Sequence, residues 1–198
     1  MSLELKNITK RFDDKILLKD FSYKFNDCGL YVIRGESGIG KTTLLRMIAG
    51  LDNDYSGIIE GAGIGKVGFA FQEYRLFPQL SALENVVFSF SDRKDKAVLE
   101  KSKRILTKLG FTKEDMNLIP RELSGGMKQR VSLARAFISD YPIILLDEPT
   151  KELDDKNVAT VRDIIKDLSL TKLIIIVSHN DDDITALSAT EILINRPE

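Results

Sequence analysis

The nine residues GESGIGKTT, at positions 35–43, constrain the fold of this chain more than any other segment. They satisfy the pattern G-x-x-x-x-G-K-[ST], with Gly35, Gly40, Lys41 and Thr42 at the fixed positions. An apolar stretch, LYVIR, comes directly before them, and TLLRMIA follows with the pattern of a helix. The segment therefore predicts a buried strand, a glycine-rich loop and a helix in immediate succession, a unit that binds phosphate groups.

Each residue type in this phosphate loop (residues 35–43) has a physical reason to be there. Glycines let the backbone wrap closely around phosphates with its N–H groups pointing inward, and the helix N-terminus adds partial positive charge. Lys41 would reach the β- and γ-phosphates of a nucleotide, and the Thr42 hydroxyl would bind Mg²⁺. A chance glycine-rich turn is the alternative, which the flanking strand and helix disfavour. The expected binding residues are Gly35, Glu36, Ser37, Gly38, Ile39, Gly40, Lys41, Thr42 and Thr43.

A second candidate site follows the apolar run at residues 143–146, where the sequence reads IILLDEP. A buried strand that ends in two carboxylates is costly to build unless a cation or a reacting water is nearby. We assign Asp147 to Mg²⁺, directly or through water, and Glu148 to orienting or deprotonating the attacking water. Two solvated carboxylates at the start of a loop are the alternative, which the phosphate loop upstream makes less favourable.

The order of apolar patterns along the chain predicts the fold class. Short apolar runs at residues 30–33, 143–146, 173–177 and 192–194 have helical patterns between them, which is typical of an α/β fold with a largely parallel sheet. The beginning of the chain differs, because apolar and polar residues alternate there with the period of half-exposed antiparallel strands. The alternating apolar positions are Leu3, Leu5, Phe21, Tyr23 and Phe25.

The middle of the chain shows helical periodicity and no convincing strand. One apolar face combines Val98, Ser102, Ile105 and Leu109, with Gly110 as a candidate helix end, and a second helix is expected over residues 127–138. The expected fold is an α/β P-loop NTPase core, with a mostly parallel sheet flanked by helices, an N-terminal antiparallel β subdomain and an inserted α-helical subdomain. We expect residues 1–198 to form one domain, with the core at about 1–80 and 140–198 and the helical subdomain at about 81–139.

Composition limits the classes of partner and compartment. The chain of 198 residues has 29 basic and 30 acidic side chains, so its net charge of −1 gives no bulk electrostatic reason to bind nucleic acid. Its single cysteine, Cys28, excludes an intrachain disulfide and fits a reducing compartment. The N-terminus lacks a signal-peptide pattern, and the apolar runs are too short to span a bilayer. We therefore expect a soluble, intracellular protein that needs another chain for any membrane part.

The stretch LSGGMKQR, residues 123–130, narrows the class further. A serine and two glycines stand directly before a predicted helix, which makes a second anion-binding helix start with a free hydroxyl and flexible amides. One nucleotide loop and two phosphate-seeking segments suggest that the second segment serves another subunit. A symmetric head-to-tail dimer would let the Ser-Gly-Gly of each chain cover the nucleotide of the other.

With these motifs in place, the whole chain resembles the ATPase domain of ABC transporters. The resemblance rests on six motifs in family order: GESGIGKT, the glutamine of FAFQE, LSGGMKQR, IILLDEP, the Leu-Asp of KELD and the histidine of IVSHN. It implies that the chain binds and hydrolyses ATP with Mg²⁺. Within the family, the segment QEYRLFPQLSALENV and the methionine after Ser-Gly-Gly look most like ATPases of nitrate, sulfonate or taurine importers.

The resemblance also implies roles for individual residues. Phe12 would stack on adenine, although a strand-end hydrophobe could also occupy its position. Gln72 would contact Mg²⁺ or the attacking water, with a solvated strand-end amide as the alternative. The implied catalytic residues are Glu148, His179 and Gln72. The implied metal ligands are Thr42, Gln72 and Asp147. The residues that would act on the ATP of the partner chain are Ser124, Gly125, Gly126 and Asp154.

One motif departs from the family pattern. The segment before Leu153 and Asp154 reads Lys151-Glu152, where family members often have small residues. Lys151 would lie near the seam of the dimer and alter how tightly it closes.

Two functions follow from the resemblance. The first is an ATPase subunit that forms a homodimer around two ATP and powers transport through separate integral membrane permease subunits, with an extracytoplasmic receptor as a further partner. Such a subunit would be cytoplasmic and peripheral on the inner face of the membrane. The second is a non-transport ABC ATPase acting on DNA or ribosomes, which the lack of coiled-coil insertions, zinc-binding cysteines and a second ATPase domain disfavours. Neither function requires this chain to contact cargo.

Overall fold

The computed structural model describes residues 2–13, 15–63, 65–90, 95–178 and 181–195. The strands are β1 (Glu4–Phe12), β2 (Lys15–Lys24), β3 (Gly29–Arg34), β4 (Ser56–Glu60), β5 (Val67–Ala70), β6 (Ile143–Asp147), β7 (Leu173–Val177) and β8 (Thr190–Leu193). The helices are α1 (Lys41–Ile48), α2 (Ala82–Val87), α3 (Lys96–Lys108), α4 (Gly125–Phe137), α5 (Asp155–Ser169) and α6 (Asp181–Leu187). Two 3₁₀ turns, η1 (Asp115–Asn117) and η2 (Pro120–Glu122), lie between α3 and α4.

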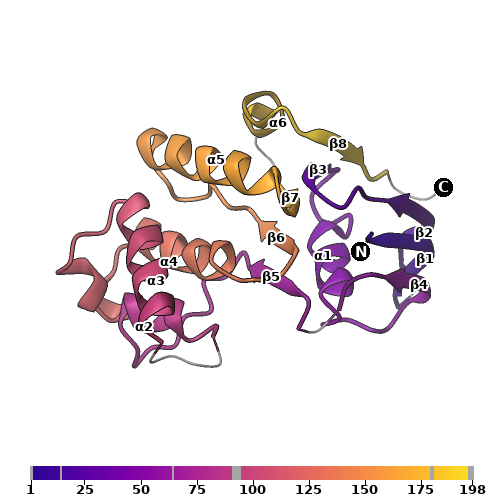
Figure 1. Ribbon diagram of the computed structural model, residues 1–198. Coiled ribbons are helices and arrows are strands. Elements are labelled where there is room, and N and C mark those ends of the chain that lie inside the picture. Colours follow the sequence, from indigo (N-terminus) through magenta and orange to yellow (C-terminus); the bar gives the residue numbers. More distant parts are fainter. Residues whose placement is uncertain (1, 14, 64, 91–94, 179–180, 196–198) are drawn as a thin grey trace.

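A five-stranded parallel sheet forms the centre of the molecule, in the order β5-β6-β7-β3-β8 (Figure 1). Its three central strands are β-branched and leucine-rich runs that are buried along almost their whole length, as strands covered on both faces must be. Because all five strands run the same way, their carboxyl ends meet at one edge. The segments that follow β3, β5, β6 and β7 therefore converge there.

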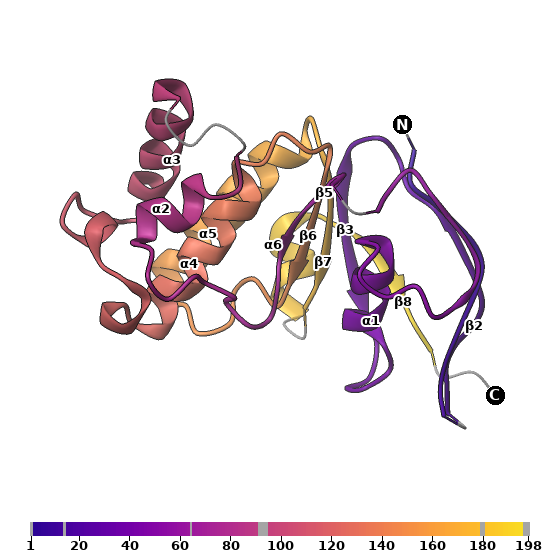
Figure 2. The ribbon, with the colours of Figure 1, turned by 90° about the horizontal axis from the view of Figure 1, so that it is seen from below.

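One face of the central sheet is covered by α1 and by a second, antiparallel sheet in the order β2-β1-β4. Figure 2 shows α1 between the two sheets. The apolar residues of α1, including Leu44, Leu45 and Ile48, share a core with Leu5 and Ile8 of β1. The N-terminal antiparallel strands expected from the alternating pattern are thus confirmed.

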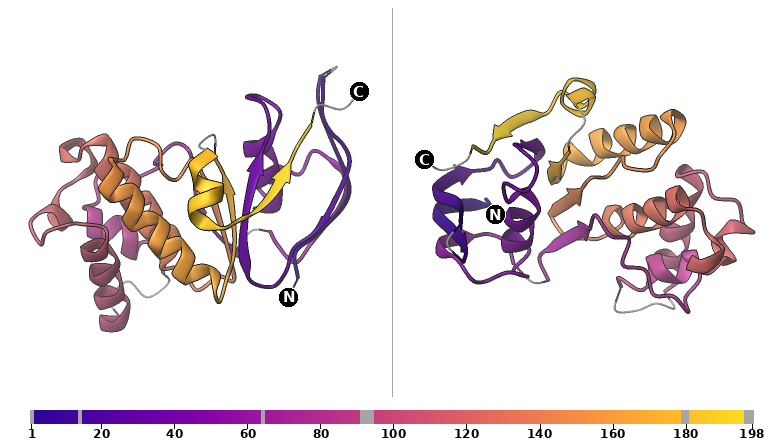
Figure 3. Two further views of the ribbon diagram at one scale, coloured as in Figure 1. Left: turned by 90° about the horizontal axis from the view of Figure 1, so that it is seen from above. Right: turned by 180° about the vertical axis from the view of Figure 1, so that it is seen from behind.

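The other face of the sheet is covered by helices (Figures 2 and 3). Helix α4 packs against β5 and β6, and residues of α2, α3, α4 and α5 share one apolar core with the even-numbered residues of β3, β6 and β7. Between β5 and β6, the described residues contain helices and turns and no strand. The α/β P-loop fold class with helices inserted in the middle of the chain is therefore confirmed.

Side-chain caps decide where the inserted helices begin. Ser81 and Glu84 form a reciprocal capping box at the start of α2, and Asp95 and Ser124 cap α3 and α4. Because the Ser124 side chain accepts a hydrogen bond from the Met127 backbone N–H, α4 begins at Gly125 and not at residue 127 as expected. No helix within the described part of the chain combines the length and the apolar character needed to span a membrane.

Candidate nucleotide-binding site

The phosphate loop connects β3 to α1, and its glycines allow the backbone conformation that it adopts. Gly35, Gly38 and Gly40 all have positive φ angles, of 153°, 74° and 109°. A Cβ atom on Gly35 would lie 2.5 Å from the backbone oxygen of Ile194, so a side chain would not fit there. This backbone path therefore requires glycine at these positions of the sequence pattern.

The side chain of Lys41 folds back against the backbone of the phosphate loop. It is only 5% exposed, and its ammonium donates to the backbone oxygens of Gly35 and Glu36 at 2.8 and 2.9 Å. Burial lowers the pKa of Lys41, while the negative charges of Glu148 and Asp147 oppose that shift. The loop thus holds a partly desolvated cation at its centre, where an anionic ligand would find strong attraction.

A cavity of about 460 Å³ opens between this loop and the ends of β5, β6 and β7. It brings together Gln72, which follows β5, and Glu148, which follows β6, although the two lie in distant parts of the sequence. The loop residues that line the cavity are Ser37, Gly38, Gly40, Lys41, Thr42 and Thr43. Its remaining walls are Leu17, Lys151 and Val177, which the sequence motifs did not predict to lie there.

The acidic end of β6 lies at the same edge. Asp147 is 2% exposed and stands opposite Val177 of β7, which is in turn level with Ile33 of β3. Glu148 adopts a left-handed φ of 54°, and its backbone N–H donates to the Val177 oxygen at 2.8 Å. The turn thus fixes the backbone of Glu148 where its side chain lines the cavity.

The oxygen donors near this cavity suit Mg²⁺. A carboxylate from Asp147, a hydroxyl from Thr42 and an amide oxygen from Gln72 are all hard ligands. The described residues contain no group of three or more His, Cys, Asp or Glu side chains that could hold a metal by themselves. This donor set fits a magnesium ion that is held jointly by the protein and nucleotide phosphates.

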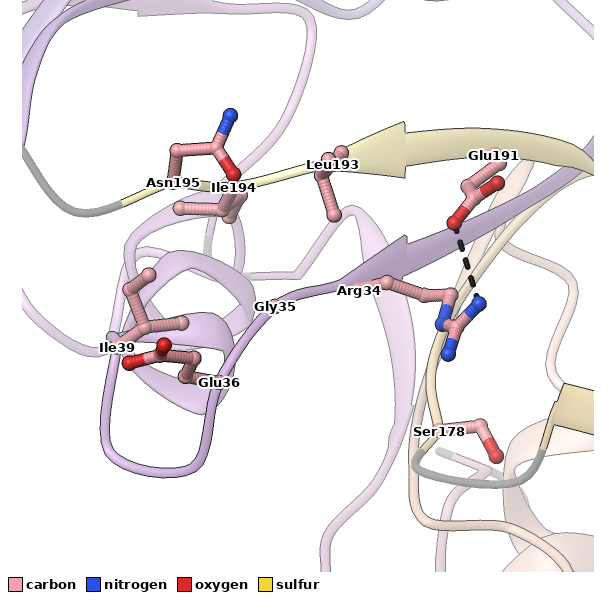
Figure 4. Close-up of a pocket in the computed structure, with 9 residues that line it drawn as sticks. All are labelled: Arg34, Gly35, Glu36, Ile39, Ser178, Glu191, Leu193, Ile194 and Asn195. Carbon is pink, nitrogen blue, oxygen red and sulfur yellow. Dashed lines mark hydrogen bonds and ion pairs between the residues drawn. The ribbon is translucent and has the colours of Figure 1, made fainter.

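The opposite side of the phosphate loop faces a second cavity, of about 390 Å³ (Figure 4). Glu36 lies along its loop side, and its far wall is formed by β8 and by the ion pair of Arg34 with Glu191 at 3.4 Å. Ile39, which also lines it, is 4% exposed and belongs to the apolar core around α1. Within the expected binding set, Gly35, Glu36 and Ile39 thus line a different cavity from the other loop residues.

Phe12 stands apart from both cavities, at the end of β1, with 52% of its surface exposed. The Lys10 ammonium lies 4.8 Å from the centre of its ring and is held by Asp52 and by the backbone oxygen of Asp54, at 2.9 and 2.5 Å. Lys10 itself is 2% exposed, so the ring rests beside a buried, paired cation. The structure therefore presents Phe12 as an exposed aromatic face.

The residues expected to act on a partner's nucleotide occupy two helix starts. Ser124 caps α4, and Asp154 caps α5 by accepting from the Asn157 backbone N–H at 2.9 Å, a bond that lowers the pKa of Asp154. Neither they nor Gly125 and Gly126 line the 460 Å³ cavity. The structure therefore does not bring this set to the phosphate loop of its own chain.

Two side chains that the sequence motifs gave no separate role connect these parts. Gln129 of α4 is 2% exposed and donates to the backbone oxygens of Glu148 and Pro149, each at 3.2 Å. Arg130 donates to Gly126, Leu109 and Asn157. Both belong to the LSGGMKQR motif, so their place in it was the only signal available. His179, the remaining expected catalytic residue, lies outside the described residues.

The site combines a buried lysine in a glycine-rich loop with the end of a neighbouring parallel strand, where Asp147 and Glu148 lie. This combination defines a P-loop nucleoside triphosphatase. A family profile described as ABC transporter matches residues 18–151, and the chain belongs to this family. It is an ATP-binding and ATP-hydrolysing subunit that powers transport, and the alternative of an ABC ATPase acting on DNA or ribosomes is not supported.

Individual relatives agree with this assignment. The chain is 37% identical over 203 residues to an aliphatic sulfonates import ATP-binding protein, SsuB, of Bacillus cereus, and the match covers 95% of this chain and 79% of the relative. It is 34% identical to the sulfate/thiosulfate import ATP-binding protein CysA of Ralstonia nicotianae, over 99% of this chain and 57% of the relative. The expected likeness to sulfonate-type importer ATPases is confirmed.

Solved structures match as well. One, described as the dimeric structure of MJ0796, a bacterial ABC transporter cassette, has a TM-score of 0.85 and 30% identity, covering 93% of this chain and 90% of the other. A second, a post-hydrolysis state of MJ0796 bound to ADP and Pi, has a TM-score of 0.84 and 28% identity, covering 98% and 94%. These matches agree with the P-loop fold and with ATP as the nucleotide that the chain binds and hydrolyses.

Proposed function

We propose that two copies of this chain close head to tail around two ATP molecules and that each ATP is hydrolysed at a site built from both copies. The observation that carries this proposal is the separation of the site into two parts. The phosphate loop, Gln72 and Glu148 share one cavity, while Ser124, Gly125 and Gly126 form a capped helix start outside its walls. The name of MJ0796 as a dimeric cassette supports the same arrangement.

Within one chain, the phosphate loop holds the ATP phosphates, Lys41 neutralises charge on the β- and γ-phosphates, and Glu148 accepts a proton from the attacking water. Thr42, Asp147 and Gln72 hold Mg²⁺, which supplies further charge neutralisation at the phosphates when bound. Phe12 stacks on adenine, and His179 contacts the γ-phosphate or the water. Buried Lys41 and the fixed backbone of Glu148 make this half of the site rigid before ATP arrives.

From the second chain, the Ser124 hydroxyl, the amides of Gly125 and Gly126 and the positive end of α4 approach the γ-phosphate. Asp154 contacts the phosphate-loop side of the partner. Because the γ-phosphate is lost on hydrolysis, the two copies separate after the reaction. The opening and closing of the dimer is the motion that the protein passes on to its partner subunits.

We infer that this motion reaches separate integral membrane permease subunits through the helical region at about residues 81–139 and the segment that carries Gln72. The chain itself is then peripheral on the inner face of the membrane, and an extracytoplasmic receptor completes an importer. The relatives that are named as import ATP-binding proteins support this partnership. These two relatives are named for different cargo, sulfonates and sulfate/thiosulfate, although they are similarly related to this chain, at 37% and 34% identity. We therefore infer that the partner subunits, and not the ATPase, select the cargo.

Two variants test the divided site. Glu148→Gln should bind ATP and accumulate as a dimer with little turnover, as measured by size-exclusion chromatography with ATP and by phosphate release. Ser124→Arg should keep ATP binding by the monomer and lose turnover, whereas Ser169→Arg, at the end of α5, should keep both. If Ser124→Arg abolished ATP binding by the monomer, the assignment of Ser124 to the partner's site would be wrong. Unchanged turnover in Glu148→Gln would remove Glu148 from the role of base.

A further inference from the structure

One side-chain contact joins the segment after Gln72 to the loop after Glu148, and it lies against the start of α4. The phenol of Tyr74, two residues after Gln72, donates a hydrogen bond to the carboxylate of Glu152, four residues after Glu148. The two residues are 78 positions apart in the sequence. This contact involves one of the two residues, Lys151 and Glu152, at which the chain departs from the small residues common in the family.

The Tyr74–Glu152 pair lies against the start of α4. A Cβ atom on Gly125 would stand 2.5 Å from the Glu152 Oε2 atom and 3.4 Å from the Tyr74 hydroxyl oxygen. A Cβ atom on Gly126 would stand 2.9 Å from the Glu152 backbone oxygen. The two glycines of the signature motif therefore provide the space that this pair fills.

The loop that carries Glu152 is held in an unusual shape. Glu152 has a left-handed φ of 63°, which a residue with a side chain rarely adopts without compensating contacts. Two turns confine it, from the Lys151 N–H to the Glu148 oxygen at 3.2 Å and from the Leu153 N–H to the Thr150 oxygen at 3.3 Å. The loop thus presents the Glu152 carboxylate at a defined position relative to Glu148.

Tyr74 is fixed from its other side by α4. The Arg135 guanidinium donates to the backbone oxygens of Tyr74 and Arg75, at 3.2 and 3.0 Å. The hydrogen bond to Glu152, followed by burial, raises the pKa of Tyr74 to about 12, so the phenol stays protonated and remains a donor. The contact accordingly closes a ring that runs from the Gln72 segment to α4, to the loop after β6 and back.

We propose that the Tyr74–Glu152 hydrogen bond is a positioning contact that fixes the α4 start, Ser124–Gly125–Gly126, relative to Gln72 and Glu148 of the same chain. This inference rests on the proposed divided site. Gln72 and Glu148 face the ATP of their own chain, while the α4 start faces the ATP of the partner. The pair therefore connects the two ATP sites of the dimer, and it makes hydrolysis at one depend on occupancy of the other.

The test compares Tyr74→Phe, Glu152→Ala and Glu152→Gln in the full-length chain. Tyr74→Phe and Glu152→Ala remove the hydrogen bond and should lower kcat by about tenfold, since small misplacements of positioned groups cost this much or more. Their Hill coefficient for ATP should fall towards 1, while the affinity of the monomer for ATP stays unchanged. Glu152→Gln should be close to wild type, because its amide oxygen still accepts the phenol hydrogen bond.

Two controls distinguish this positioning role from a non-specific loss of folding or activity. Tyr141→Phe removes a phenol hydroxyl from a surface tyrosine and should change neither kcat nor the Hill coefficient. In the double variant Tyr74→Phe/Glu152→Ala, kcat should be no lower than in either single variant, because both remove the same contact. Unchanged monomer affinity for ATP shows that each variant is folded.

Two outcomes would overturn the inference. One is an unchanged kcat and Hill coefficient in Tyr74→Phe. Another is a Glu152→Gln variant as impaired as Glu152→Ala beside an active Tyr74→Phe, since the charge and not the hydrogen bond would then matter. Failure of the proposed function is a different result, because the wild-type chain would then lack ATP-dependent dimerisation and turnover altogether.

Discussion

The carboxylate of Asp183 on α6 shows how a single residue outside the nucleotide cavity can set its geometry. It is 1% exposed and accepts hydrogen bonds from Thr150 at 3.3 Å, from Ser178 at 2.5 Å and from Arg162 at 2.7 Å. Thr150 lies in the loop after β6, and Ser178 directly follows β7. One buried charge therefore connects two of the loops that converge at the sheet edge.

Removing that charge should be costly for stability. Asp183→Ala leaves the largely buried Arg162 guanidinium and two hydroxyl groups without their acceptor, and we expect a loss of about 3 kcal/mol of unfolding free energy. Urea unfolding followed by circular dichroism measures it. The matched control is Asp167→Ala, which breaks a surface pair with Lys108 and should cost less than about 1 kcal/mol. Equal losses in the two variants would contradict the role given to Asp183.

Lys151 carries a prediction of its own, because the structure places it in the wall of the nucleotide cavity. A second cation beside Lys41 attracts the ATP phosphates, although exposure to water weakens that attraction to roughly 1 kcal/mol. Lys151→Ser should therefore raise the KM for ATP by several-fold in steady-state assays. Lys156→Ser, an exposed position on α5, should not. A KM unaffected by Lys151→Ser would mean that this ammonium does not face the phosphates.

At the scale of elements, local sequence patterns were sufficient to predict most of the central sheet. The apolar runs at residues 30–33, 143–146 and 173–177 became β3, β6 and β7, because a buried parallel strand needs only a short β-branched or leucine-rich run. Gly110 ends α3 with a φ of 83°, as a glycine after a helix end should. These features depend on neighbouring residues alone, which is why the sequence reveals them.

Features that depend on distant residues were not predictable in the same way. β4 and β5 lie in a glycine-rich stretch, and each strand is defined by its pairing with β1 or β6 more than by its own pattern. The contacts of Tyr74 with Glu152 and of Gln129 with Glu148 join residues far apart in sequence. The motif positions predicted which residues gather at the sheet edge, but the side chains that hold those residues in place could be identified only from the structure.

Asp154, at the start of α5, has two roles that substitutions can distinguish. Asp154 caps this helix, and it is also proposed to contact the partner chain. Asp154→Asn keeps a good capping residue, so its melting temperature should match wild type, while Asp154→Ala should melt a few degrees lower. ATP turnover should fall in both variants, because both remove the negative charge that the proposed partner contact uses. Normal turnover in Asp154→Asn would limit Asp154 to its capping role.

At the scale of the whole molecule, the sheet edge and the α4 start are the two separate halves of the site that we propose. The central sheet gathers the phosphate loop, Gln72, Asp147 and Glu148 at the carboxyl ends of its strands. The helices on its other face carry Ser124 to a position outside that cavity. On the proposed function, the molecule has a nucleotide-binding half and a nucleotide-covering half, and a second copy brings the two together at one ATP.

This division predicts that two inactive variants will restore each other's activity. Lys41→Ala lacks a working phosphate loop, and Ser124→Arg lacks a working α4 start, so neither homodimer contains a complete site. In a heterodimer, the phosphate loop of the Ser124→Arg chain meets the intact α4 start of the Lys41→Ala chain. Random pairing of equal amounts makes half of the dimers mixed, each with one complete site of two. Phosphate release should therefore recover to at most about a quarter of the wild-type rate, and coupling between the two sites would keep it below that limit.

The reciprocal mixture supplies the control. The double variant Lys41→Ala/Ser124→Arg, mixed with wild-type chain, also gives mixed dimers, but each of these contains no complete site, because the wild-type phosphate loop meets the blocked α4 start and the wild-type α4 start meets the dead loop. Its activity should come only from the wild-type homodimers that remain. Activity in the first mixture together with this loss in the second would require sites shared between copies, whereas no recovery in the first mixture would mean that each chain hydrolyses ATP with its own residues alone.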